Sequence, residues 1–121
     1  MKGVEGFADL MIAASSGMRS AHREILDEWR PEEPPVTTLF AALGYRIAED
    51  FDSSSIDANR QLFALIEGAM ESGDQDLVMA VATGLIEALA TRALQKEDLW
   101  KRIVPLLGPR SLDYAKAWLR A

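Results

Sequence analysis

The chain has 121 residues, of which 49% are apolar and 26% charged, and this composition excludes a generally disordered chain and is typical of one globular domain, residues 1–121. Because cysteine is absent, a disulfide framework, a thiolate metal site and a cysteine nucleophile are excluded. The formal net charge of −6 repels phosphate backbones, so we expect no nucleic-acid binding.

The first expected element is a long amphipathic helix from Glu5 to Trp29, in which apolar residues recur at three- and four-residue steps. Gly17 is its weak point, since glycine inside a helix costs about 1 kcal/mol relative to alanine. It predicts a kink, a break into two helices or a close approach to the central helix, and the sequence does not choose among them.

A stiff connector, Pro31 to Pro35, should end this first helix, because each proline fixes its own backbone and disfavours helix at the residue before it. Thr37 or Thr38 is then expected to cap a second helix that runs to about Phe51. Its C-terminal end carries acidic side chains, although the helix dipole prefers cations there.

The next helix should begin after the serines at 53–55, with Ser54 and Asp57 spaced as a capping pair. Gly73 is expected to end it and Asp74 to cap the helix that follows. Because the connection is so short, the two helices are predicted to form an antiparallel hairpin.

The organising element is the segment 77–94, which is apolar around almost its whole circumference. Thr83, Glu87 and Thr91 form a narrow polar seam because they are spaced by four. Gly84 marks a place where another helix can approach closely. A membrane span is not expected, because charged residues lie just before, inside and just after the run.

The C-terminal part predicts a short helix from Leu99 that Pro105 distorts, followed by a last helix capped by Ser111. Trp100 and Trp118 are expected to close the core. No alternating strand pattern occurs anywhere. The sequence therefore predicts an all-α, single-domain bundle of about six helices around the buried helix 77–94.

A search for chemistry finds no site. The single histidine, His22, has no carboxylate or second ligand three or four residues away, so we expect no metal site. Glu67 and Glu71 are interpreted as a solvated face, with Glu67→Gln expected to be nearly neutral. The glycines are scattered and form no phosphate-binding loop. We therefore expect no cofactor and no enzymatic activity.

The charge is unevenly distributed. Residues 1–95 hold 16 acidic and 7 basic side chains, a balance of −9, and residues 96–121 hold 3 acidic and 6 basic ones, a balance of +3. Nine of the acidic residues lie between Glu24 and Asp57, against only Arg30 and Arg46. Clustered carboxylates steer a basic protein toward them, although a solvated face has the same composition. The residues expected to bind a protein partner are Glu28, Glu32, Glu33, Glu49, Asp50 and Asp52.

Two stretches, PPVTTLFAALGYRIAEDF from Pro34 to Phe51 and LGPRSLDYAKAW from Leu107 to Trp118, resemble small helical immunity proteins of bacterial contact-dependent growth inhibition and related polymorphic toxin systems. The resemblance implies a cytoplasmic, noncatalytic protein that neutralises a cognate toxin by binding and occluding it. A cytoplasmic location also fits the absence of cysteine and of a signal peptide at Met1 to Asp9. The partner would be a basic toxin domain.

The alternative function is a helical adaptor or regulatory module that binds a protein through an apolar groove. Salt-sensitive, fast association would favour the acidic face, and salt-insensitive binding would favour the groove.

Overall fold

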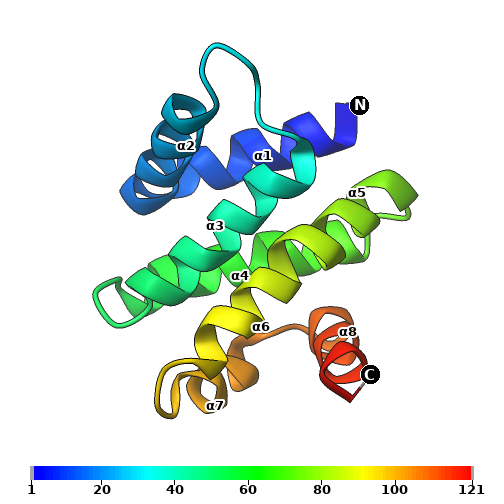
Figure 1. The fold of residues 1–121 in the computed structure, drawn as a ribbon. Coiled ribbons are helices and arrows are strands. Elements are labelled where there is room, and N and C mark those ends of the chain that lie inside the picture. The colour runs from blue at the N-terminus through cyan, green and yellow to red at the C-terminus, as the bar shows by residue number, and fades with distance from the viewer. Residues whose placement is uncertain (1, 121) are drawn as a thin grey trace.

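The computed structural model describes residues 2–120, and over that range it contains helices and no β-strand, which confirms the predicted all-α class (Figure 1). The elements are α1 (Lys2–Ala14), α2 (Ser16–Trp29), α3 (Val36–Asp50), α4 (Ile56–Met70), α5 (Gln75–Ala80), the π-helix η1 (Val81–Ile86), α6 (Glu87–Leu94), α7 (Leu99–Ile103), the 3₁₀-helix η2 (Val104–Leu106) and α8 (Pro109–Arg120). With α5, η1 and α6 counted as one continuous helix, residues 2–120 form seven helices instead of about six.

The additional helix comes from a break in the first predicted one. Ser15 has an extended backbone, and its hydroxyl accepts the Met18 N–H at 3.1 Å, so it ends α1 and caps α2. Gly17 lies two residues further on, where a Cβ atom would overlap the carboxylate of Asp50. Of the three alternatives the break into two helices therefore holds. The close neighbour of Gly17 is Asp50 and not the central helix.

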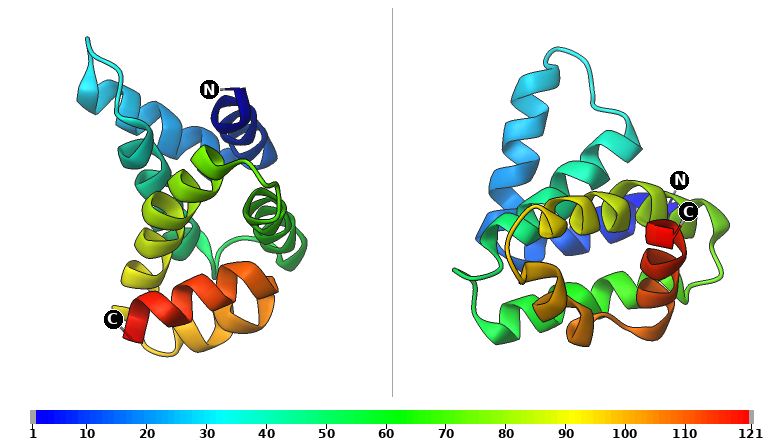
Figure 2. Two further views of the ribbon diagram at one scale, coloured as in Figure 1. Left: turned by 90° about the vertical axis from the view of Figure 1, so that its right-hand side faces the viewer. Right: turned by 60° about the horizontal axis from the view of Figure 1, so that its bottom comes forward.

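The break gives α2 a direction of its own. Together with the loop that follows it, α2 projects from the remaining helices (Figure 2). Only its inner face is covered, by Met18, Ala21 and Ile25. The end of α2 and the loop are therefore largely solvated.

The predicted central helix is confirmed in the core as the continuous run α5, η1 and α6, where Leu85 and Leu89 are fully buried. It packs mainly against α3, and the two cross at a pair of glycines. A Cβ at Gly84 would lie 2.8 Å from the Cβ of Phe40, and one at Gly44 would overlap the backbone of Leu85. Gly84 is thus a crossing point as predicted, and Gly44 is its counterpart on α3.

The central helix contains a π-helical turn, Val81–Ile86, that the sequence pattern did not indicate. Within it, the Thr83 hydroxyl donates to the Met79 carbonyl oxygen at 2.7 Å. A π turn holds more residues per turn than an α turn, so side chains on either side of it do not share one helical phase.

One segment of the described chain, Gln75–Leu94, is long and apolar enough to cross a membrane by length and composition alone. A buried core helix passes the same test, and 56% of the most apolar window is buried inside the fold. Burial in the bundle accounts for the apolar character of this helix.

Two predicted helix caps differ from those in the structure. α3 begins at Val36 after Pro35 and has no side-chain cap, so the expectation of Thr37 or Thr38 was wrong; proline supplies the helical start with its fixed backbone. At α4 the cap is Ser55 instead of Ser54, with its hydroxyl accepting the Ala58 N–H at 3.0 Å.

The turn between α4 and α5 was predicted correctly. Gly73 adopts a positive φ of 78°, and Asp74 accepts the Leu77 N–H at 3.2 Å. The two helices diverge beyond this turn, however, and α8 contacts both α4 and α6 and closes the opening between them (Figure 2). The hairpin is therefore open, and it is filled by the C-terminal helix.

The C-terminal segment follows the prediction in part. Pro105 lies in the 3₁₀ turn η2, which confirms the distortion, and Trp100 packs partly buried against the core. Trp118 is also partly buried. Ser111 does not cap α8, which already begins at Pro109; its side chain is fully buried instead.

Candidate partner-binding surface

Three of the six predicted partner-binding residues lie on the projecting part of the molecule. Glu28 is on α2, where it lines a hollow against α3, and Glu32 and Glu33 are in the loop that leads to α3. All three are exposed, and within residues 2–120 none of their carboxylates takes part in a hydrogen bond or ion pair. We call Glu28, Glu32 and Glu33 the acidic protrusion.

Basic residues neutralise the other carboxylates near the protrusion. Arg46 reaches from α3 to Glu24 on α2, with Nη2 2.6 Å from the carboxylate, and Arg30 pairs with Asp27 at the same distance. The negative charge left on this part of the surface is therefore that of the protrusion itself.

Two other predicted residues, Glu49 and Asp52, are already paired. Glu49 accepts hydrogen bonds from Arg92 at 2.6 Å and Lys96 at 3.1 Å, while Asp52 is held by both terminal nitrogens of Arg102. We call these five residues the charge network. The pKa of Glu49 lies below its ordinary value because of the hydrogen bond from Lys96 and then that from Arg92, and the hydrogen bond from Arg102 lowers the pKa of Asp52.

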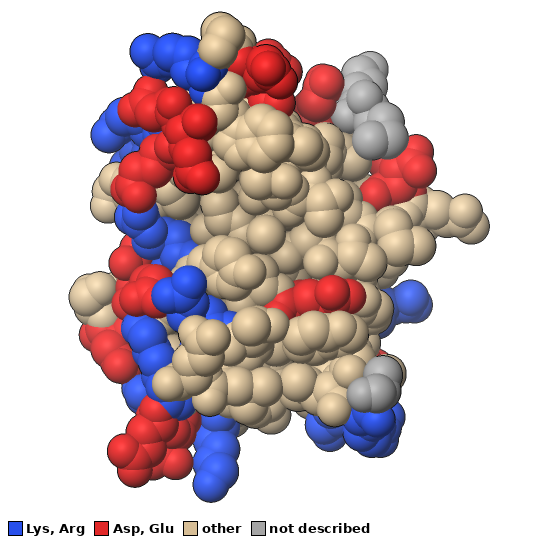
Figure 3. Space-filling model, in the orientation of Figure 1, with Lys and Arg blue, Asp and Glu red and all other residues tan. Residues whose placement is uncertain are grey.

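Aromatic rings support the same network. The guanidinium of Arg92 lies over the Tyr45 ring, 5.1 Å from its centroid, and that of Arg102 lies over the Phe51 ring at 5.8 Å. In Figure 3 charged side chains of both signs gather along the left edge of the molecule, with smaller groups at the top and on the right, and most of the central face carries no charge. The acidic end of α3 is thus joined to the basic end of α6 and to α7, which offsets the unfavourable helix dipole.

Asp50, the sixth predicted residue, is partly buried beside Gly17, and its backbone oxygen accepts the N–H groups of Ser53 and Ser54. The structure therefore does not bring the six residues together on one face. The loop with Glu32 and Glu33 lies at the start of α3, and Asp50 and Asp52 lie at its end, whereas Glu28 and Glu49 line one hollow between α2 and α3.

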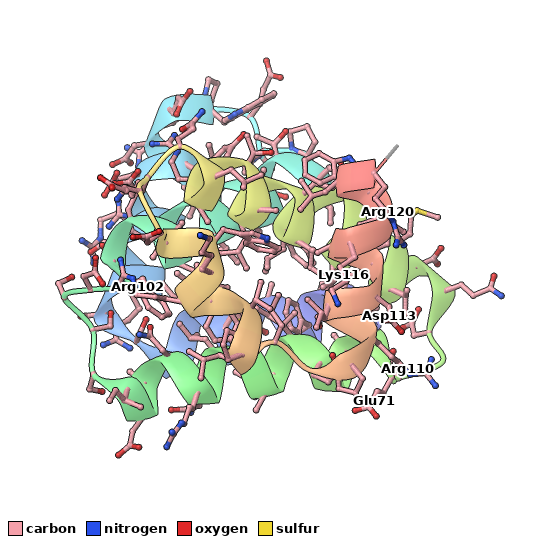
Figure 4. All side chains as sticks on the ribbon, turned by 90° about the horizontal axis from the view of Figure 1, so that it is seen from below. Glu71, Arg102, Arg110, Asp113, Lys116 and Arg120 are labelled. Atoms are coloured by element: carbon pink, nitrogen blue, oxygen red, sulfur yellow. The ribbon has the colours of Figure 1, made fainter. Side chains whose placement is uncertain are left out.

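The basic C-terminal part of the sequence is divided in the same way. Arg102 turns to Asp52, whereas Arg110, Lys116 and Arg120 lie along the outer side of α8, together with Asp113 (Figure 4). The positive charge of residues 96–121 is thus partly used to neutralise the end of α3.

Glu67 has a structural role that the sequence interpretation missed. Its carboxylate accepts the backbone N–H of Arg110 at 2.9 Å, the N–H of Ser111 at 3.0 Å and the Ser111 hydroxyl at 2.7 Å. Burial raises its pKa, but these hydrogen bonds outweigh burial and leave the pKa below its ordinary value. Glu67 on α4 therefore caps α8, and the interpretation as a solvated face was wrong.

A second carboxylate holds the same helix. The Tyr114 hydroxyl on α8 donates to Glu87, a member of the predicted polar seam on the central helix. Burial of the ring, followed by this contact with a carboxylate, raises the pKa of Tyr114 to about 12. Within the polar seam, Glu87 therefore binds a side chain of the same chain, Tyr114.

The described residues do not assemble an evident metal site, since no group of three or more His, Asp or Glu side chains within 2–120 is placed to hold a metal ion. His22 lies on α2 and lines a pocket of about 260 Å³ under the α2–α3 loop. Three surface features are suited to a partner: the protrusion, this pocket and a separate apolar groove between α1 and α4.

Comparison with known proteins adds a family assignment. No curated protein and no solved structure matches the chain. The model of a domain of unknown function, DUF7674, matches residues 8–120. This range includes most of α1 and all of the helices from α2 to α8. The chain therefore belongs to the DUF7674 family.

Proposed function

We propose that this chain is an immunity protein that neutralises a cognate bacterial toxin by binding a basic surface of the toxin and occluding it, without catalysis. The observation that carries the proposal is the acidic protrusion, whose three exposed carboxylates have no internal partner within residues 2–120. Carboxylates already paired within a protein gain little from a new cation, whereas unpaired ones attract it at full strength. The protrusion is therefore a part of the surface that fits a basic partner.

Contacts that hold α2 and the following loop in place favour the same function. The buried side chains of α2 fix the helix against α3, and the Arg46–Glu24 ion pair joins the two helices near the protrusion. The Glu32 N–H also donates to the Trp29 carbonyl oxygen at 2.9 Å, which orders the start of the loop. A preorganised surface loses less conformational entropy on binding, as tight inhibition requires.

We expect the gene beside that of this chain to encode the toxin, and the test uses that toxin. The Glu32→Lys, Glu33→Lys double variant should melt like the wild type and should associate with the toxin about ten-fold or more slowly at low salt, with the difference closing as salt rises. A matched control is Glu97→Lys with Asp113→Lys, because both residues are exposed and the change in net charge is identical. Association that is equal for both variants and the wild type at both ionic strengths would contradict the proposal.

A second function, a helical adaptor, is favoured by a different observation. An apolar groove of about 370 Å³ lies between α1 and α4, and Leu10 stands 57% exposed at its edge. Such a groove fits the apolar face of a partner helix. If Leu10→Glu abolished partner binding while the Glu32→Lys, Glu33→Lys variant bound normally at all salt concentrations, the adaptor function would replace the first.

A further inference from the structure

The loop of the acidic protrusion passes over the pocket that His22 lines. α1, α2 and α3 each contribute to its wall, and the loop contributes Glu33 and Pro34. Its volume is about 260 Å³, which is below the roughly 300–1,000 Å³ of pockets that bind drug-sized ligands. The pocket therefore has room for one long side chain.

The lining combines an apolar wall with an acidic rim. Val4, Leu39 and Phe40 supply apolar surface, and the carboxylate of Glu33 has no hydrogen bond or ion pair within the described chain. Glu5 also lines the pocket, although it has another interaction, and His22 stands on the α2 side. A group that fits here has an apolar stem and a positively charged end.

We infer that this pocket receives a single arginine or lysine side chain of the protein partner. The methylene stem would lie along the apolar wall, and the charged end would meet Glu33, in the manner in which long basic side chains cover apolar surface elsewhere in proteins. A buried basic side chain that ends on a carboxylate is also the kind of central anchor that dominates the free energy of many interfaces. The inference rests on the proposed function for the identity of the partner, but the pocket can be tested without it.

The first experiment uses agmatine as the probe. It carries a guanidinium group on a four-carbon stem, and an ammonium group stands at the other end, where a partner side chain would join its backbone. Added to the isotope-labelled protein, it should shift the amide resonances of His22, Val36 and Leu39 in a saturable way in the millimolar range, as expected for a ligand of so few atoms. Butanol, which has the stem without the charge, and guanidinium ion, which has the charge without the stem, should each bind at least about five-fold more weakly, because each lacks one of the two contacts.

Two variants separate charge from shape. Glu33→Gln should weaken agmatine binding about three-fold or more, while Glu32→Gln, a neighbour in the same loop that does not line the pocket, should leave it unchanged. Leu26→Trp should block the mouth, since Leu26 lines the pocket and is 36% exposed. No saturable shift at these residues, or equal effects of the two glutamine variants, would overturn the inference.

The outcomes also separate this inference from the proposed function. If agmatine does not bind but the Glu32→Lys, Glu33→Lys variant still slows association with the toxin, the pocket assignment fails and the docking surface stands. If agmatine binds as expected but toxin association is indifferent to both the lysine variants and Leu26→Trp, the pocket stands and the immunity function fails.

Discussion

Glu67 and Ser111 lie 44 positions apart in the sequence, yet one carboxylate oxygen of Glu67 accepts both the backbone N–H and the hydroxyl of Ser111. The other oxygen accepts the N–H of Arg110. The first turn of α8 thus has its free amide groups satisfied by a side chain from α4, and an anion lies at the positive end of the helix dipole.

The first prediction concerns this contact. Glu67→Gln replaces a charged acceptor of three hydrogen bonds by an amide that offers only one oxygen, and we expect it to lower the free energy of unfolding by about 1–3 kcal/mol. Urea denaturation at neutral pH measures the difference. Glu71→Gln is the matched control, because Glu71 is exposed and should change stability by less than about 0.5 kcal/mol.

The second prediction is the pH dependence of the same contact. Because the pKa of Glu67 in the folded protein is below its ordinary value of 4.5, the unfolded chain binds a proton more readily, and protonation favours unfolding. The stabilisation by Glu67 is therefore present above about pH 4.5 and is lost as pH falls through the folded pKa. Denaturation curves between pH 7 and pH 3 should show the gap between wild type and Glu67→Gln narrowing below about pH 4.5; a gap that stays constant would contradict the assigned role.

The third prediction concerns Tyr114, whose pKa is raised to about 12 by burial and by its contact with Glu87. The chain has two tyrosines, so a Tyr45→Phe variant reports on Tyr114 alone. Its tyrosinate absorbance should appear near pH 12, and Glu87→Gln should move it to lower pH. Since the folded state keeps the proton longer, the contact stabilises the protein below about pH 10 and is lost between about pH 10 and pH 12.

The fourth prediction concerns the crossing of α3 and the central helix. Gly44→Ala places a methyl group against the backbone of Leu85, which cannot move aside as a side chain can, and should destabilise by about 1–3 kcal/mol or more. Gly68→Ala has open space at its Cβ and should stabilise α4 by about 0.5–1 kcal/mol. Thermal melting of the two variants should therefore shift in opposite directions.

The fifth prediction concerns the charge network. Asp52→Arg should lower the melting temperature, because it places a cation beside Arg102, and the loss should diminish at high salt. Combining it with Arg102→Asp restores opposite charges and should recover part of the loss. If the stability lost by the double variant equals the sum of the losses of the two single variants, this ion pair contributes nothing to stability.

Features that depend on neighbours in the chain could be predicted from the sequence. Gly73 ends α4 and Asp74 caps α5 because both effects act within one turn of a helix. The core position of the central helix followed from its apolar circumference. The sequence does not distinguish Ser54 from Ser55 as the cap of α4, because adjacent serines have almost the same capping potential. The three-dimensional course of the loop decides between them.

Features that depend on distant partners could not be predicted. Glu49 finds Arg92 at 43 positions and Asp52 finds Arg102 at 50, and no local pattern relates them. In the sequence the acidic residues between Glu24 and Asp57 are therefore indistinguishable as partner-binding residues, although basic side chains neutralise part of them within the fold. The one available signal was the excess of basic residues after residue 95, which indicated a complement to the acidic stretch without giving the pairs.

The π-helical turn Val81–Ile86 has a consequence for sequence comparison within the family. A π turn accommodates one extra residue, and each residue of an α-helix rotates by about 100°, so the residues of α5 and those of α6 belong to two helical wheels with different phases. Deleting one residue between 81 and 86 would convert the π turn into an ordinary α turn and leave α6 facing as it does, so Arg92 would still reach Glu49. A one-residue alignment gap in this turn would therefore mark a relative with an uninterrupted α-helix here, whose α6 presents the same face to α3 and α8.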